Sequence, residues 1–149
     1  MKLLLRKAVP EDAPEIDALF REMLRSIYPG RSVSGYAPGQ LDRFFSGGED
    51  WICAAEAEGA LVCFLSLEVH REARDYLYLD DCSVAEPFRG RGIGSRLLAE
   101  AESYARSLGL PLLVLHVEKS NARARRLYRR LGYLDAGERD SRFRMIKRL

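Results

Sequence analysis

The feature that most constrains the fold is a strand, a glycine-rich turn, a helix and a second strand in succession. Residues 76–84 have strand character, and the turn Arg89-Gly90-Arg91-Gly92-Ile93-Gly94 follows them. Apolar residues then recur at helical spacing over 93–108, and 112–117 is a nearly unbroken apolar run, typical of a parallel strand buried on both faces. A strand, helix and strand of this length form a right-handed crossover unit. The segment therefore predicts an α/β core.

The remaining segments add helices and strands around this unit. Asp12 followed by Glu15 predicts a capped helix that continues at helical spacing to Ile27. The segment 31–40 is rich in Ser, Gly and Pro and predicts a loop. We also expect strands at 1–6, 51–56, 60–69, 133–136 and 143–147, a tight turn at Glu58-Gly59, a short amphipathic helix over 41–45 and a last helix over 121–131.

Size and composition fit one domain, residues 1–149, with an ordinary core and surface, since 47% of the residues are hydrophobic and 31% are charged. Three leucines between basic residues at 1–6 are too few for a signal peptide or a membrane span. Cys53, Cys63 and Cys82 show no CxxC spacing and lie in apolar stretches, where cysteine behaves as a small hydrophobe. These features predict a protein of the reducing cytoplasm with no membrane partner.

Charge and metal-ligand patterns indicate no further partner. The formal net charge of +2 is too small to indicate a nucleic-acid-binding domain, so nucleic acid is not the expected partner. His70 and His116 have no carboxylate or cysteine pattern around them, so we predict no metal and treat both as structural. A monomer and a homodimer are both compatible with the sequence.

The turn at 89–94 has the features of an anion site. Free backbone N–H groups at a helix N-terminus point outward, and the helix dipole adds positive charge there. Glycines let a bulky anion approach the main chain, and the guanidinium groups of Arg89 and Arg91 match phosphate oxygens. The turn therefore indicates a phosphate or pyrophosphate site, although three glycines also serve simply to shape a tight turn.

Two better-known phosphate motifs fit this turn poorly. A P-loop requires Gly-Lys-Ser or Gly-Lys-Thr, which does not follow here. A dinucleotide-binding fold places its glycine turn after the first strand, with an acidic residue closing the next strand. Glu118 does follow the next strand, but the turn lies past the middle of the chain, which argues against this interpretation.

Two motifs resemble those of the GNAT superfamily of N-acetyltransferases. The pyrophosphate loop of that family reads Arg/Gln-x-x-Gly-x-Gly/Ala after a strand that ends in Val, and Arg89, Gly92 and Gly94 match it here. The segment 121–133 follows the family pattern Asn-x-x-Ala-x-x-Leu-Tyr-x-x-x-Gly-Phe/Tyr. The opening before the first helix and the late hairpin are also similar, so the resemblance spans nearly the whole chain. Cys63 departs from it, because many relatives carry Gly there.

The resemblance implies a single domain with a mixed, strongly twisted sheet of about six to seven strands and helices on both faces. The strands 76–84 and 112–117 would splay apart, and the pantetheine arm of acetyl-CoA would lie between them. The implied cofactor-binding groups are the main chain of Cys82, Ser83 and Val84, the turn residues Arg89, Gly90, Arg91, Gly92, Ile93, Gly94 and Ser95, and the side chains of Asn121 and Tyr128.

Acetyl transfer to an amine requires a neutral nitrogen, a polarised thioester carbonyl and a proton for the departing thiolate. Tyr128 is similar to the family tyrosine near the sulfur, and a phenol with an ordinary pKa of about 10 is protonated at neutral pH. It also belongs to an apolar helical stripe with Leu127 and Leu131, which is typical of core. Both roles are compatible, because a buried tyrosine keeps its hydroxyl paired. Asn121 is expected to cap the helix.

Asp80 occupies the position that resembles the frequent Glu base of the family. Asp is shorter, so a base at this position would act through a water. The alternative, in which Asp80 or Asp81 binds the substrate ammonium or a backbone amide without proton transfer, is left open. Strand alternation places Tyr76, Tyr78, Asp80 and Cys82 on one side and Leu77, Leu79, Asp81 and Ser83 on the other.

The last predicted helix carries a dense run of arginines. Such a run usually forms a solvated face. One or two of its members can pair with the 3'-phosphate of CoA, and RNA binding is a weaker interpretation. The run consists of Arg123, Arg125, Arg126, Arg129 and Arg130.

The sequence therefore predicts an acetyl-CoA-dependent N-acetyltransferase that acetylates a primary amine of a small molecule, peptide or protein by direct attack in a ternary complex. A non-catalytic acyl-CoA-binding sensor module is the alternative, and a nucleic-acid-binding domain is a third hypothesis. The segment 27–45, which selects the acceptor in the family, has no readable motif. Glu68 and Asp75 are compatible with a cationic amine, but surface carboxylates are too common to decide.

Overall fold

Seven strands form one sheet in the order β1-β2-β3-β4-β5-β7-β6 in the computed structural model, which describes residues 2–149. Every predicted strand and helix is present among these residues, with ends that differ by a few residues, and the short helix expected over 41–45 is a 3-10 helix. Met1, where the first predicted strand begins, lies outside the described residues. The elements are β1 (Leu4–Lys7), η1 (Pro10–Asp12), α1 (Ala13–Ile27), η2 (Asp42–Phe45), β2 (Trp51–Ala57), β3 (Ala60–His70), β4 (Tyr76–Val84), η3 (Glu86–Phe88), α2 (Ile93–Ser107), β5 (Leu112–Glu118), α3 (Ala122–Arg130), β6 (Leu134–Arg139) and β7 (Arg142–Arg148).

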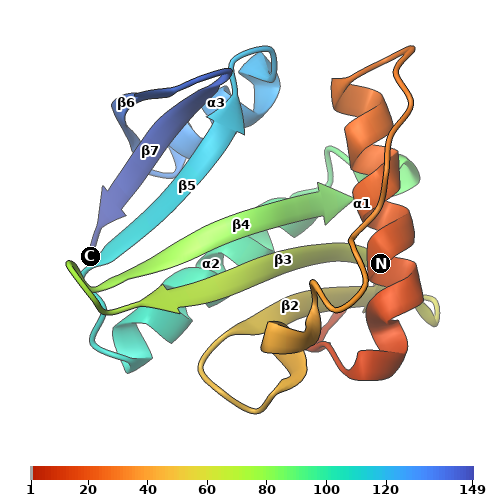
Figure 1. Cartoon of the computed structure of the whole chain (residues 1–149), viewed down its shortest axis with the longest axis horizontal. Helices are drawn as coiled ribbons and strands as arrows, with labels where there is room; N and C mark the ends of the chain where they lie inside the picture. Colours follow the sequence, from red (N-terminus) through yellow and green to blue (C-terminus); the bar gives the residue numbers. More distant parts are fainter. Residues whose placement is uncertain (1) are drawn as a thin grey trace.

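The sheet is mixed, because β4 and β5 pair in parallel while the other neighbours are antiparallel. The parallel pairing runs from Leu77↔Leu113 to Leu79↔Leu115, and the described strands then diverge. Figure 1 shows the resulting V, with β5 and β7 turned away from β4. The predicted fold class and the predicted splay are therefore confirmed.

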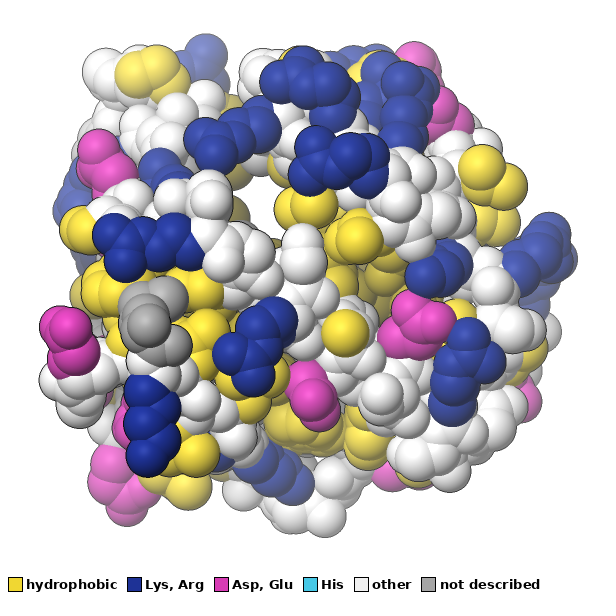
Figure 2. Space-filling view, turned by 180° about the vertical axis from the view of Figure 1, so that it is seen from behind, with side chains coloured by type: hydrophobic (Ala, Val, Ile, Leu, Met, Phe, Trp, Pro, Cys, Tyr) yellow, Lys and Arg dark blue, Asp and Glu magenta, His cyan; other side chains and the backbone are white. Residues whose placement is uncertain are grey.

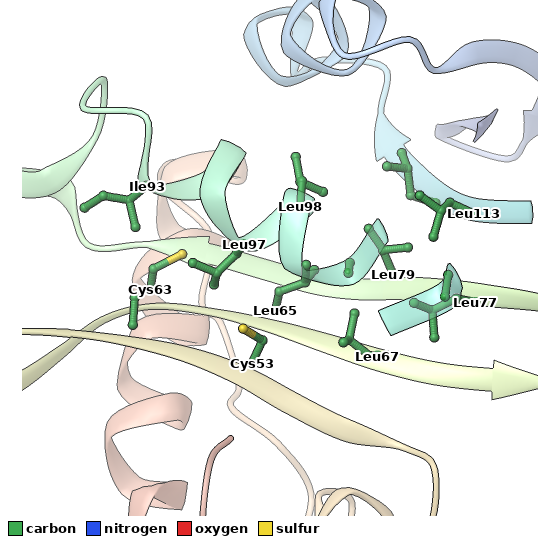
Figure 3. Packing of buried hydrophobic residues seen from close by; sticks show 14 of the residues in the cluster. Cys53, Cys63, Leu65, Leu67, Leu77, Leu79, Ile93, Leu97, Leu98 and Leu113 are labelled. Atoms are coloured by element: carbon green, nitrogen blue, oxygen red, sulfur yellow. The ribbon is translucent and has the colours of Figure 1, made fainter. Parts of the chain in front are cut away.

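Two layers of helix cover the two faces of the sheet. Helix α1 lies over one face, where Ile16 packs with Ile52 and Phe64 of β2 and β3. Helix α2 lies over the other face, where Leu97 packs with Leu65 and Leu79 (Figure 3). Complete burial of such a side chain stabilises the fold by about 1.5–3 kcal/mol. These two cores hold β3 and β4 firmly on both faces, next to the open side of the V.

A β-bulge interrupts β4 at the point where β4 and β5 begin to diverge. The β3–β4 register shifts between Leu65 and Leu67 of β3, opposite Asp80 and Asp81 of β4. One residue of β3 therefore stands opposite two residues of β4, which bends the strand and increases its twist.

The alternation predicted along 76–84 was wrong beyond this bulge. Cys82 packs with Leu79 in the core beneath α2, although strict alternation placed them on opposite sides. The Ser83 hydroxyl donates a hydrogen bond of 2.7 Å to the carbonyl of Leu19 in α1, on the other face. One extra residue reverses the face of every later side chain, which is why the simple pattern failed.

The start of α1 also differs from its predicted capping box. Asp12 stands at the N-cap, but its carboxylate forms no cap hydrogen bond to the helix. It accepts hydrogen bonds from Arg6 at 2.7 and 2.8 Å and from the Val9 amide at 2.8 Å. Glu15 accepts a hydrogen bond from the Leu61 amide of β3 instead. Tertiary contacts have replaced the local cap.

Among residues 2–149, no helix is both long and apolar enough to cross a membrane.

Candidate active site

A cleft of about 230 Å³ occupies the opening between β4 and β5. Its lining includes Met23 and Leu24 of α1 from one face of the sheet, and Leu98 of α2 and Ala124 of α3 from the other. The cleft therefore reaches both faces through the gap in the sheet. Figure 2 shows an opening on the α2 side of the molecule, with Lys and Arg side chains gathered around it.

The glycine-rich turn joins the end of β4 to the first residue of α2. Gly90 and Gly92 have φ angles of +76° and +77°, and Gly92 is the N-cap of α2. A Cβ placed on Gly92 would meet nothing within 4 Å. The amides of the first helical turn, Ile93 to Ser95, have no carbonyl four residues earlier in the helix to bind. This geometry fits an anion that approaches main-chain N–H groups.

Two arginines near this turn, Arg89 and Arg123, differ in their contacts. The Arg89 Nε donates a hydrogen bond of 2.9 Å to the Val84 carbonyl, and Nη2 lies 3.8 Å from Glu22 of α1. The guanidinium therefore contacts β4 and α1 and braces the turn, and the role predicted for Arg89 at the phosphate stays a prediction. From α3, Arg123 Nη2 lies 3.4 Å from the position of a Cβ on Gly90 and brings a different cation to the turn.

Helix α3 supplies two of the predicted residues. The Asn121 side chain accepts a hydrogen bond of 3.2 Å from the Ala124 amide, which confirms its capping role. Tyr128 lines the cleft, and its ring stands edge-on to Tyr133 at 5.8 Å between centroids. Burial raises the pKa of the Tyr128 phenol far above its ordinary value. This phenol is therefore a proton donor at every physiological pH.

The end of β4 contains three residues that were predicted to bind the cofactor through their main chain, Cys82, Ser83 and Val84. Cys82 lines the cleft together with Asp80, Asn121 and Tyr128, so the structure brings these predicted residues together. The Ser83 hydroxyl is occupied by α1, as described above. Cys63, which departs from the family pattern, is a buried free thiol in β3 next to the end of β4 in the sheet.

Asp80 and Glu68 form a carboxyl pair across β4 and β3. Burial, and then the hydrogen bond with Asp80, raise the pKa of Glu68 to about 7. Arg43 limits this rise, because its Nη1 lies 3.5 Å from Glu68 Oε1, and His70 Nε2 lies 3.4 Å from the same oxygen. Because the pKa is raised, Glu68 still holds its proton below neutrality and releases it as the pH rises through 7. Glu68 is therefore a proton-exchanging group next to Asp80, which lines the cleft.

Asp81, the other residue of the bulge, is shielded by the segment that precedes η2. The Tyr36 hydroxyl donates a hydrogen bond of 2.7 Å to Asp81 Oδ2, and the Tyr36 ring stacks on Phe20 at 4.1 Å. Burial and the neighbouring Asp80 charge raise the pKa of Asp81 to about 6. Asp80 is exposed by comparison. Asp80 is thus the bulge carboxylate that is open to a substrate.

The opposite wall of the cleft contains residues that sequence reasoning missed. His116, treated as structural, is the first residue of β5 beyond its pairing with β4, and its Nδ1 lies 2.7 Å from the Tyr78 hydroxyl. Burial, followed by the charges of Arg142 and neighbouring arginines, lowers the pKa of His116, so its imidazole is neutral at physiological pH. The Tyr28 hydroxyl donates a hydrogen bond of 2.7 Å to Glu118 Oε1 across the cleft.

These residues gave no local signal. Arg142 begins β7, and it stands beside Glu118 because β7 pairs with β5. That neighbour relation follows from the sheet order, which no motif encodes.

The arginine run on α3 is partly engaged by its own domain. Arg125 and Arg129 form ion pairs with Asp135 of β6 at 3.1 and 2.6 Å. Arg125 also lies over the ring of Phe143, 3.7 Å from its centroid. Arg125 and Arg129 are therefore part of the structure of the domain, which weakens the RNA-binding interpretation of the run.

Comparisons with known proteins agree on one family. The model of the Acetyltransferase (GNAT) family matches residues 16–133. An uncharacterised N-acetyltransferase of Bacillus subtilis, YhfO, is 33% identical over 136 residues, which cover 87% of this chain and 88% of that protein. The aminoalkylphosphonate N-acetyltransferase of Salmonella typhimurium is 32% identical over 149 residues, which cover 97% of this chain and 90% of that protein.

Solved structures show the same fold. The PaiA N-acetyltransferase of Thermoplasma acidophilum, in complex with coenzyme A, superimposes with a TM-score of 0.89 over 100% of both chains. The two sequences are 22% identical, so this likeness concerns the fold.

Proposed function

This chain belongs to the acetyltransferase (GNAT) family and is an acetyl-CoA-dependent N-acetyltransferase, and from that premise we propose that it transfers the acetyl group directly to a primary amine held beside Asp80 in a ternary complex. The cleft through the sheet supports this proposal, because its lining brings together Asp80 at the bulge and Leu98 of α2, the helix that begins at the glycine-rich turn. A donor bound along β4 and an acceptor bound at the bulge can meet inside it. The named relatives act on different amines, so the family alone does not identify the acceptor.

The cofactor site proposed for acetyl-CoA consists mainly of backbone groups. The amides from Ile93 to Ser95 and the left-handed glycines fit a pyrophosphate, and Arg123 supplies a guanidinium beside them. The main chain at Cys82 and Val84 borders the gap in which a pantetheine arm would lie. When bound there, acetyl-CoA supplies the thioester that the amine attacks.

The proposed chemistry moves two protons. The acceptor ammonium gives one proton to the Asp80–Glu68 pair, directly or through a water, and becomes a nucleophile. The carbon–nitrogen bond then forms as the carbon–sulfur bond breaks, and the nitrogen loses a further proton to solvent, from which the Tyr128 phenol is reprotonated after it has acted. Tyr128 donates the second proton to the departing thiolate, and its phenol is suited to that step because burial keeps it protonated.

Acetyl-CoA is expected to raise the melting temperature of the protein by several degrees at about a hundred times its Kd, because a ligand that binds the folded state stabilises it by mass action. NAD and ATP lack the pantetheine arm and should shift it far less at equal concentration. Differential scanning fluorimetry with the three ligands measures this. An equal shift with NAD, or no shift with millimolar acetyl-CoA, contradicts the cofactor assignment.

Asp80→Asn is expected to shift the rise of kcat/KM with increasing pH to higher pH values. In the wild type the rise should centre near neutrality, because Glu68, with a pKa of about 7, shares the proton of the pair. Without Asp80 the amine loses its proton to solvent, so its own pKa sets the rise. If the variant keeps the profile and raises the acceptor KM alone, Asp80 binds the ammonium and is no base.

A further inference from the structure

The acceptor end of the cleft has one acidic wall and one basic wall. Asp80 of β4 and Arg142 of β7 both line the cleft. Burial is the main cause of the raised pKa of both Tyr78 and Asp81; beyond it, the charge of Asp80 raises these pKa values and the charge of Arg142 lowers them. Their effects on His116 are also opposite. A substrate beside these three groups therefore lies between a negative and a positive charge.

Arg142 supplies the positive charge of the basic wall. Among residues 2–149, no side chain forms a hydrogen bond or an ion pair with its guanidinium. Glu118 is the register partner of Arg142 on β5, but the Glu118 carboxylate accepts the hydrogen bond from Tyr28. A guanidinium that faces a cleft without a partner is suited to bind a planar anion through two parallel hydrogen bonds.

The acidic wall offers one open negative charge. Asp81 is engaged by Tyr36, and Glu68 shares its proton with Asp80 while Arg43 and His70 stand close to it. One ammonium neutralises this wall. A second ammonium would meet the basic wall, where Arg139 and Arg144 lie near His116 in addition to Arg142. Charge complementarity therefore disfavours a dicationic acceptor.

We propose that the acceptor is a compact zwitterionic amine, with its ammonium group at Asp80 and a carboxylate, phosphonate or similar anionic group at Arg142. The inference rests on the proposed function, because it places the reacting amine at the bulge. Ser66 Oγ stands opposite the bulge, where it is buried and has no hydrogen-bond partner among the described residues.

The first test is an acceptor series that varies charge at nearly constant length. Free thiol release from saturating acetyl-CoA is measured with 4-aminobutanoate, 3-aminopropylphosphonate, 4-amino-1-butanol and 1,4-diaminobutane. We expect kcat/KM to be at least about tenfold higher for the preferred zwitterion than for the neutral alcohol, and lowest for the diamine. The two zwitterions show which anion the basic wall prefers.

The second test is Arg142→Gln, compared with Arg148→Gln as a matched control. Arg148 lies near the other end of β7, so its substitution removes the same charge from the same strand. Arg142→Gln should lower the preference for the zwitterion over 4-amino-1-butanol by about tenfold or more, mainly through KM. Arg148→Gln should leave that preference unchanged.

Several results would overturn the proposal. These are a preference for 1,4-diaminobutane, equal loss of all acceptors in Arg142→Gln, or no turnover of either zwitterion by a wild-type protein that binds acetyl-CoA. Each of them leaves acetyl-CoA use intact. Failure of the wild type to bind acetyl-CoA would instead contradict the proposed function itself, so the two failures are distinguishable.

Discussion

Gly92→Val is expected to weaken acetyl-CoA binding by about a hundredfold or more while the protein stays folded. Gly92 has φ +77° at the N-cap of α2, and a Cβ there would project into open space beside the first-turn amides. A branched side chain at this point blocks the approach of a pyrophosphate to the main chain. The left-handed backbone also costs a non-glycine residue about 1–2 kcal/mol, which a typical domain tolerates.

The matched control for this prediction is Gly47→Val. Gly47 has φ +83°, its added Cβ would also meet nothing within 4 Å, and it lies in the turn between η2 and β2. Both variants therefore carry the same backbone strain, but one of them is remote from the cofactor site. Calorimetric titration with acetyl-CoA and thermal melts of both proteins separate binding from stability. Unchanged affinity in a folded Gly92→Val protein would remove the turn from the cofactor site.

The crossover unit was predictable because its signals are local. The apolar run over 112–117, the helical spacing after Ile93 and the glycines of the turn each reflect the geometry of one short segment. The capping role of Asn121 is local as well. Periodicity therefore predicts the positions of the elements. The resemblance to the family adds the prediction that the two parallel strands splay apart.

The details of the bulge were not predictable from alternation. A register shift arises from the fit between two strands, and here it places Asp80 and Asp81 in different environments. One carboxylate is open to the cleft, and the other accepts a hydrogen bond from Tyr36. Tyr36 itself belongs to the loop segment, where neither period nor motif predicts a contact with β4. Assignment of chemical roles in this strand therefore required the tertiary structure.

The basic wall depends on strand order. The chain forms β6 before β7, yet β7 lies next to β5 and β6 forms the edge. Arg142 reaches the cleft through that insertion, far from any of the motifs. Arg89 shows what a local motif leaves open. The motif predicted the position of the turn, but contacts with Val84 and Glu22 orient the Arg89 side chain.

Tyr128→Phe is expected to lower kcat by roughly ten- to a thousandfold with little change in acetyl-CoA affinity, in line with the contribution of a general acid. The substitution keeps the ring, so its packing against Tyr133 should survive. The lost hydroxyl leaves the thiolate to depart without a proton. Turnover is measured with a good acceptor, and the solvent isotope effect and viscosity dependence show whether chemistry limits the rate.

Tyr133→Phe is the control that separates catalysis from packing. Tyr133 is 2% exposed, it contacts the Tyr128 ring, and burial raises the pKa of its phenol as well. It does not belong to the lining of the cleft among the residues that the structure describes. Loss of its hydroxyl should therefore change stability but leave kcat within about twofold, since no reacting atom is near. If Tyr128→Phe retains full turnover while chemistry is rate-limiting, Tyr128 is a core residue and the thiolate leaves unaided.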